Sequence, residues 1–155
     1  MSETIEARLA RLEVALPVAA APAANYLPCV LHEGILYISG QLPLVDGAVS
    51  CRGKLGDTVD VGAAQAAARI CAINILAQAK AALDGDLERI RQVLRVTGYV
   101  ASAPGFTDHH LVVNGASDLL AEALGARGRH ARAALGVAAL PLDAAVEIDA
   151  IIAVA

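Results

Sequence analysis

The final 26 residues of the chain, HARAALGVAALPLDAAVEIDAIIAVA, constrain its fold more than any other segment. Two apolar stretches, at about 131–138 and 145–154, have the length and the side chains typical of strands. Between them stands Leu140-Pro141-Leu142-Asp143. Because Pro141 fixes its own φ and favours an extended conformation at Leu140, we expect the chain to turn here. The C-terminal segment is therefore predicted to supply two strands of a sheet.

Each of these strands carries a charge near its start, Arg132 in the first and Glu147 in the second. Unpaired buried charges are costly, so both side chains need partners. A guanidinium can hold a carboxylate through two parallel hydrogen bonds, and Glu147 could polarise a water beside it. We therefore look for chemistry at this pair. The alternative is a structural ion pair of Arg132 with Glu147 or Asp149, which share one strand face because they are two residues apart.

The whole pattern predicts an α+β sheet in the order β-β-α-β-α-β-β, with two helices packed on one side. Asp60 is the expected N-cap of the first long helix, and Gly125 is expected to end the second. We expect residues 1–25 to form a short helix and an extended arm, and residues 26–155 to form a single domain. Before the C-terminal pair, strands are predicted at Tyr26–Leu31, Ile35–Ser39 and Val93–Ser102, helices at 4–12, 61–83 and 107–124, a loop at 44–60 and a connector at 87–91.

Length and charge exclude several classes of protein. At 155 residues the chain is long enough for one domain. A net charge of −4, with three Tyr and one Phe, argues against nucleic-acid binding through phosphate neutralisation or base stacking. The longest apolar window, at about 62–79, is interrupted by Gln65, Arg69, Asn74 and Gln78, so no membrane span is expected. We expect a cytoplasmic protein.

No motif for a metal or an organic cofactor is found. Cys29, Cys51 and Cys71 have no CxxC spacing, and we expect them to be buried or half-buried thiols, with a catalytic thiolate as the alternative. His109 and His110 are adjacent, hence about 100° apart on a helix, and do not easily face one metal. Glycine-rich phosphate motifs are absent from the sequence. No cofactor is expected.

Several motifs together resemble the reactive-intermediate deaminase family, also called YjgF and historically grouped with the L-PSP endoribonucleases. The similarity runs from about Tyr26 to the C-terminus. The motifs that carry it are Ser39-Gly40-Gln41 after an apolar strand, Val113-Asn114 in the second long helix, Ala131-Arg132, Ala139-Leu140-Pro141 and Val146-Glu147-Ile148-Asp149-Ala150.

The resemblance implies a chorismate-mutase-like fold and a homotrimer with clefts between neighbouring subunits. The archetype hydrolyses enamines and imines such as 2-aminoacrylate to 2-keto acids and ammonia. By resemblance, Arg132 would bind the substrate carboxylate and Glu147 would orient the attacking water. By the same resemblance, Tyr26 and Asn114 fall on family positions that line or support the cleft, and Ser39 falls where the family has its small hydroxyl residue near the ligand.

The chain also departs from the archetype. Ala133 and Ala134 follow Arg132, where family members often have Ser or Thr and then Cys, and the N-terminal helix and arm are additional. His130 shares a strand face with Arg132 by the two-residue period and could donate a proton at the cleft mouth, or it could be a solvent-exposed histidine. Asn114 could instead be a buried amide that satisfies the backbone.

Tyr26 has two interpretations as well, a hydroxyl that binds the ligand or a half-buried aromatic with its tip in water.

Three functions follow from the sequence: an imine deaminase, a non-catalytic binding protein for small carboxylates or 2-keto acids, and an endoribonuclease. Imine hydrolysis needs only a carboxylate clamp, an oriented water and a group that transfers protons, so the first is preferred.

Overall fold

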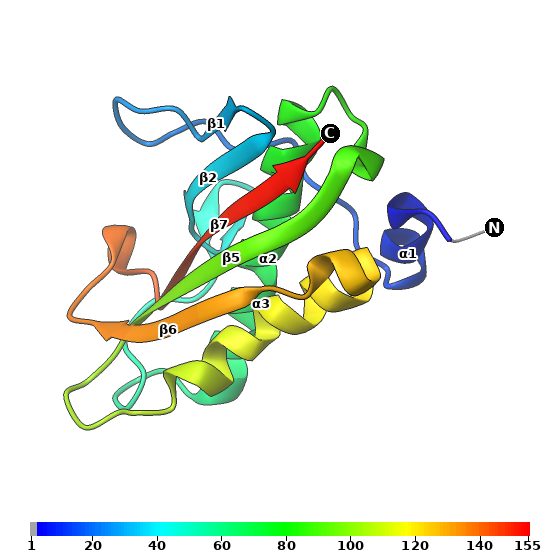
Figure 1. The fold of residues 1–155 in the computed structure, drawn as a ribbon. Helices are drawn as coiled ribbons and strands as arrows, with labels where there is room; N and C mark the ends of the chain where they lie inside the picture. Colours follow the sequence, from blue (N-terminus) through cyan, green and yellow to red (C-terminus); the bar gives the residue numbers. More distant parts are fainter. Residues whose placement is uncertain (1–2) are drawn as a thin grey trace.

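The computed structural model describes residues 3–155, and in it a five-stranded sheet is covered on one face by two long helices (Figure 1). The predicted order β-β-α-β-α-β-β is confirmed. The strands of the sheet are β1 (Cys29–His32), β2 (Ile35–Gln41), β5 (Ile90–Ala101), β6 (Ala131–Val137) and β7 (Val146–Val154), and the covering helices are α2 (Val61–Ala82) and α3 (His109–Leu124).

The strands lie in the spatial order β1-β2-β7-β5-β6. β5 and β6 are parallel, because α3 carries the chain back between them, whereas the other neighbouring pairs are antiparallel. β6 therefore forms one edge of the sheet and β1 the other. The two C-terminal strands are not neighbours, since β5 lies between β6 and β7. The short helix Pro141–Asp143 makes the predicted turn, with Leu140 extended before it.

Alternation along β7 decides which side chains face the helices. Val146, Ile148 and Ala150 are buried on the helix-covered face, so Glu147 and Asp149 point to the opposite face of the sheet. This alternation is what the apolar-polar pattern of the C-terminus predicts. Among residues 3–155 no helix covers that opposite face (Figure 1).

Three predicted boundaries differ from the structure. β1 begins at Cys29 and not at Tyr26, because Pro28 has no N–H to give to the sheet. β5 begins at Ile90 instead of Val93; the pairing of β5 with β7 shifts register twice at this end, which hides the alternation in the sequence. The predicted loop at 44–60 contains a small two-stranded ribbon, β3 (Leu44–Val45) and β4 (Ala48–Val49).

The helices begin where their caps predict. The Asp60 side chain accepts a hydrogen bond from the Ala63 N–H at 2.7 Å, which caps α2. Asp108 is the N-cap residue of α3 and Gly125, with φ +63°, ends that helix. The two helices pack closely because Gly115 of α3 has no Cβ where the Gln65 carbonyl of α2 lies. α3 is thereby fixed beside α2 on the same face of the sheet.

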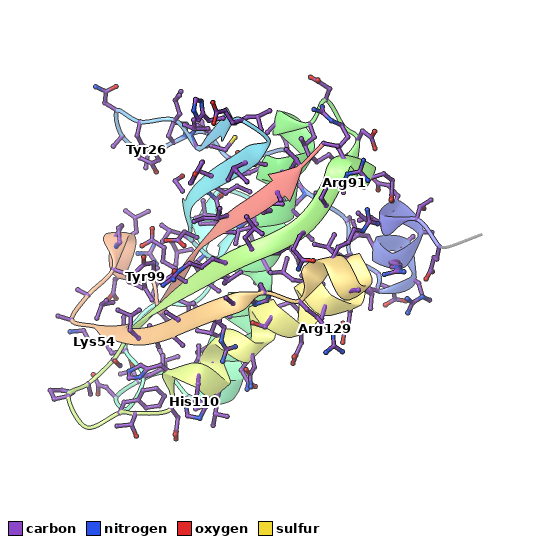
Figure 2. The ribbon with its side chains drawn as sticks, in the orientation of Figure 1. Tyr26, Lys54, Arg91, Tyr99, His110 and Arg129 are labelled. Carbon is purple, nitrogen blue, oxygen red and sulfur yellow. The ribbon has the colours of Figure 1, made fainter. Side chains whose placement is uncertain are left out.

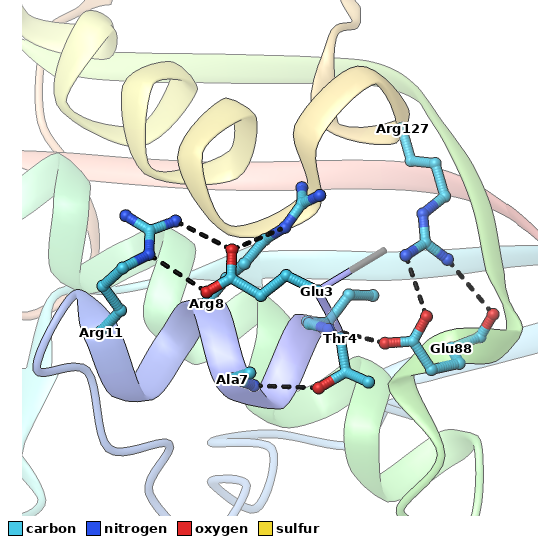
Figure 3. A network of polar contacts seen from close by, with 8 residues as sticks. Glu3, Thr4, Ala7, Arg8, Arg11, Glu88 and Arg127 are labelled. Atoms are coloured by element: carbon cyan, nitrogen blue, oxygen red, sulfur yellow. Dashed lines mark hydrogen bonds and ion pairs between the residues drawn. The ribbon is translucent and has the colours of Figure 1, made fainter. Parts of the chain in front are cut away.

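The predicted N-terminal helix, α1 (Ile5–Arg11), is fastened to the domain by polar contacts (Figure 3). Glu88, in the short helix Leu87–Arg89, accepts a hydrogen bond from the Ile5 N–H at 2.6 Å and pairs with Arg127 at 3.0 Å. The Ile5 N–H bond is the main cause that lowers the pKa of Glu88. Ile5 and Leu9 add buried apolar contacts to the core.

Candidate functional site

Arg132 projects from β6 toward α3, on the helix-covered side of the sheet. One terminal nitrogen, Nη1, donates to Asn114 Oδ1 at 2.9 Å and to Ser117 Oγ at 3.1 Å; the other, Nη2, donates to the His110 carbonyl at 3.2 Å. All three acceptors are neutral, and among residues 3–155 no carboxylate forms an ion pair with Arg132. The remaining guanidinium N–H groups are available to a ligand.

These contacts lie in an open groove of about 400 Å³ between β6 and α3. α3 presents Asn114, Ser117, Asp118 and Ala121 to the groove, since residues spaced by three, four and seven share one helix face. The strand side supplies Gly128, Arg129, His130 and Arg132. His130 is half-buried and bonded: its Nε2 lies 2.9 Å from Ser117 Oγ and its Nδ1 lies 2.6 Å from the Gly128 carbonyl oxygen.

The structure corrects three of the alternatives for these residues. Within residues 3–155, Arg132 forms no ion pair with Glu147 or Asp149, because both carboxylates face the other side of the sheet. Asn114 uses its side-chain oxygen to hold Arg132 and is not an amide that merely satisfies backbone. His130 is not a free surface histidine, since both ring nitrogens have partners.

Glu147 lies half-buried on the helix-free face, opposite Tyr99 of β5. Its carboxyl group packs against Gly40, where a Cβ would collide with it. Burial, and secondly the negative charge of Asp149, raise the pKa of Glu147. A carboxyl group with a raised pKa is a stronger base than an exposed one.

Tyr99 joins the same face and was not singled out from the sequence. Its hydroxyl donates to Asp149 Oδ2 at 2.9 Å. Burial, followed by this hydrogen bond, raises the pKa of Tyr99. Asp149 therefore accepts a hydrogen bond from Tyr99, whereas among residues 3–155 no side chain donates a hydrogen bond to the Glu147 carboxyl group.

Tyr26 and Ser39 lie together at the other edge of the sheet. Both line a small cavity of about 60 Å³ beneath residues 20–23 of the arm. Ser39 Oγ donates to the Pro28 carbonyl at 2.9 Å, whereas Tyr26 is 47% exposed. Figure 2 shows Tyr26 near the edge strand β1 and Arg129 beside α3 near the opposite edge of the sheet. The predicted site residues thus fall into separate groups in one chain.

The predicted site residues form three groups in one chain. Arg132, Asn114 and His130 line one groove, Tyr26 and Ser39 line another cavity, and Glu147 lies on the helix-free face of the sheet. Ser117 is the groove residue that sequence reasoning missed; its position three residues after Asn114 on a helix is the signal that could have found it.

A second serine–histidine contact lies near the start of α3. Ser102 Oγ is 3.0 Å from His109 Nε2, and the His109 ring stands edge-on to Phe106 with ring centroids 5.2 Å apart. His110 is exposed and takes no part in this contact.

Within residues 3–155 no three His, Cys, Asp or Glu side chains are grouped as metal ligands would be. No helix in the described part of the chain has the length and hydropathy needed to cross a membrane.

Comparison with known proteins places the chain in a family. Residues 6–152 match the model of the family described as "YjgF/chorismate mutase-like, putative endoribonuclease". Protein TCP17 of Trypanosoma cruzi is 47% identical over 152 residues, which cover 97% of this chain and 94% of that protein.

Two solved structures extend the comparison. The crystal structure of Atu1372 from Agrobacterium tumefaciens, a protein of unknown function, is 54% identical, with a TM-score of 0.92 over 97% of this chain and 92% of the other. RidA from the Antarctic bacterium Psychrobacter sp. PAMC 21119 is 27% identical, with a TM-score of 0.62 over 88% of this chain and 94% of the other. The chain therefore belongs to the YjgF/chorismate mutase-like family.

Proposed function

We propose that this protein hydrolyses reactive enamines and imines of small carboxylic acids to 2-keto acids and ammonia. The observation that carries the proposal is Arg132, whose guanidinium is held at the groove by neutral acceptors and keeps N–H groups free. A cation without a carboxylate partner, facing a groove of about 400 Å³, suits a small anionic ligand. The resemblance of the sequence motifs to the reactive-intermediate deaminases implies this substrate class, and the likeness to the RidA structure supports the proposal.

The chemistry needs little apparatus, because an imine carbon is already electrophilic. Arg132 would hold the substrate carboxylate through paired hydrogen bonds and so fix the position of the carbon to be attacked. Water adds to that carbon, the nitrogen takes up a proton, and the resulting carbinolamine collapses to a ketone and ammonia. Glu147, with its raised pKa, would orient the water. No metal or organic cofactor is needed for these steps.

Arg132 and Glu147 lie on opposite sides of the sheet in one chain, so the proposal includes a homotrimer in which neighbouring subunits complete each site. Glu147, Tyr26 and Ser39 of one subunit would then face Arg132 of the next. The helix-free face supports association, because it exposes apolar side chains: Tyr37 and Val30 are each 47% exposed and Leu135 is 39% exposed. Light scattering should give three times the chain mass of 15.8 kDa; a monomer would remove any site shared between subunits.

A non-catalytic carboxylate-binding protein is the second candidate. It is favoured by the separation of Glu147 from the Arg132 groove, because a single chain then has the anchor without the carboxyl group proposed to orient the water. The two candidates differ in the effect of Glu147→Gln. A deaminase with this substitution should bind its ligand and lose ammonia release, whereas a binding protein releases no ammonia in any form.

A coupled assay tests the proposed function. An amino-acid oxidase supplies imines, and keto-acid formation is followed with the wild type, Arg132→Ala and Arg129→Ala. Arg129 is the matched control, because it lines the same groove but is exposed. We expect acceleration by the wild type and by Arg129→Ala and none by Arg132→Ala. Equal acceleration by all three, or none by the wild type across several imines, would contradict the proposal.

A further inference from the structure

Ser117 and His130 form a hydrogen-bonded pair that lines the groove, and the partners of His130 indicate which ring nitrogen of the neutral imidazole carries the proton. His130 Nδ1 lies 2.6 Å from the Gly128 carbonyl oxygen, which can only accept. Nδ1 of the neutral ring is therefore protonated, and Nε2 has a free lone pair. Ser117 Oγ, 2.9 Å from Nε2, is then the donor. The hydroxyl proton of Ser117 points at a base whose ring is held from its other side.

Arg132 completes the environment of Ser117. Its Nη1 donates to the same Oγ at 3.1 Å, so the oxygen lies beside a positive charge that would stabilise a developing alkoxide. A hydroxyl group has one proton and two acceptor positions. The proton goes to His130 and one acceptor position goes to Arg132. The remaining position is open to a molecule in the groove, which both Ser117 and His130 line.

Ser117 lies on α3 and Arg132 on β6, and His130 lies in the short link directly before β6. Ser117 lies one helical turn after Asn114 on α3, and both side chains hold Arg132. Gly128 is buried against the Leu120 carbonyl, with no space for a Cβ, which fixes the acceptor of His130 at the end of α3. Strand and helix therefore position an acid–base pair beside the proposed carboxylate anchor.

We propose that Ser117 is a catalytic hydroxyl of this groove and that His130 is the base that accepts its proton. This proposal rests on the proposed function and adds a proton path to it. As water attacks the imine carbon, a water proton passes to Ser117 Oγ while the Ser117 proton passes to His130 Nε2. His130 returns that proton by the same path to the imine nitrogen, which gives the carbinolamine. In the collapse, the carbinolamine hydroxyl proton passes by the same path to the amine nitrogen, the C–N bond breaks, ammonia leaves and the C=O bond of the keto acid forms. Ser117 contacts the water, His130 acts through Ser117, and both are restored.

The chain has a matched control in Ser102 and His109, which are also in contact, at 3.0 Å. Among residues 3–155, His109 Nδ1 has no hydrogen-bond partner, and no arginine donates to Ser102 Oγ. The Ser102 pair therefore has a base without an orienting group and an oxygen without a neighbouring cation. If proximity alone activated a serine, both pairs would react; if the full arrangement is needed, only Ser117 would.

The first experiment measures serine reactivity without any imine. The full-length protein is treated with diisopropyl fluorophosphate, and the labelled residue is located by peptide mass spectrometry. Attack of Ser117 Oγ on phosphorus expels fluoride and transfers the hydroxyl proton to His130. We expect labelling at Ser117 and not at Ser102, slowed by about a hundredfold in His130→Asn. The asparagine amide can still donate to the Gly128 carbonyl, so the variant should fold. Absent labelling, or equal rates in the wild type and His130→Asn, would overturn the pair.

The second experiment uses the coupled imine assay with Ser117→Ala, His130→Asn and Ser102→Ala. We expect kcat to fall by about a hundredfold in the first two with little change in KM, and no change in Ser102→Ala. Full activity of Ser117→Ala beside an active wild type would overturn the proton path and leave the proposed function intact. If the wild type hydrolyses no imine, both the proposed function and the proton path through Ser117 and His130 are wrong. The labelling experiment decides separately whether His130 activates Ser117.

Discussion

Gly98 of β5 is the position where one added methyl group should disturb the site most directly. It is buried, and an alanine Cβ there would collide with Val113 Cγ2 of α3 and lie 2.8 Å from Cγ1 and 3.1 Å from Cβ. Val113 is β-branched and stiff at χ1, so it cannot rotate its methyl groups away cheaply. The helix must move away from the sheet instead. Asn114 is the next residue on that helix, so Gly98→Ala should also weaken the hold on Arg132.

The magnitude follows from the geometry of this contact. Overpacking a well-packed interior by a methyl group costs about 1–3 kcal/mol. In a chain of 155 residues, each 1 kcal/mol lowers Tm by roughly 2–4 °C. Gly98→Ala should therefore lower Tm by about 2–12 °C. The double variant Gly98→Ala/Val113→Ala should be less destabilised than the sum of the single variants, because the second substitution removes the colliding methyl groups.

Thermal unfolding followed by circular dichroism, at one fixed protein concentration, measures these changes. Gly105→Ala is the control: the Cβ would have nothing within 4 Å, so the free energy of unfolding should change by less than about 1 kcal/mol. If Gly98→Ala unfolds at the wild-type temperature, or if the double variant is as unstable as the summed single variants, the packing argument is wrong.

Three further predictions concern ionisable groups. The folded-state pKa of Glu147 is raised by burial and by Asp149, so between the unfolded-state and folded-state pKa values the folded protein binds more protons than the unfolded one. The free energy of unfolding therefore falls as pH rises through this range. In urea unfolding, Glu147→Gln should flatten that decline, and a pH profile equal to that of the wild type would refute the prediction. The pKa of Glu88 in the folded protein is lowered, mainly by the Ile5 N–H, so the Glu88 carboxylate stabilises the fold above its unfolded-state pKa, and this contribution is lost as pH falls through the folded-state pKa. Glu88→Gln should therefore have a lower free energy of unfolding than the wild type at neutral pH and a similar one in acid. Burial raises the pKa of Cys71 well above its ordinary value, so a thiol reagent should modify it only after unfolding, and rapid labelling of Cys71 in the native protein would contradict its placement in the core.

Local patterns predicted the elements of this fold well. The alternation of apolar and polar side chains gave β7 its buried face, and Asp60 and Gly125 marked helix ends that the structure confirms. The start of β1 was misplaced because the run of apolar residues continues before Pro28, whose missing N–H ends the pairing. Boundaries depend on pairing partners, which a local pattern does not contain.

The candidate site was harder to predict, because it depends on strand order and sheet face. Arg132 and Glu147 are near in sequence, but β5 enters between their strands and alternation sends the two side chains to opposite faces. Asn114 was identified without its partner, since nothing in the sequence says which helix covers β6. Ser117 became visible only when α3 was seen to present positions 114 and 117 to the same guanidinium.

The most direct test of the central claim is isothermal titration of a short 2-keto acid and of its methyl ester into the wild type, Arg132→Ala and Arg129→Ala. If Arg132 is the carboxylate anchor, the acid should bind the wild type and Arg129→Ala equally and bind Arg132→Ala at least about tenfold more weakly, a loss of about 1.4 kcal/mol or more. The ester should bind weakly to all three proteins. Equal affinity of the acid for Arg132→Ala and the wild type, or equal affinity of the acid and the ester for the wild type, would contradict the claim.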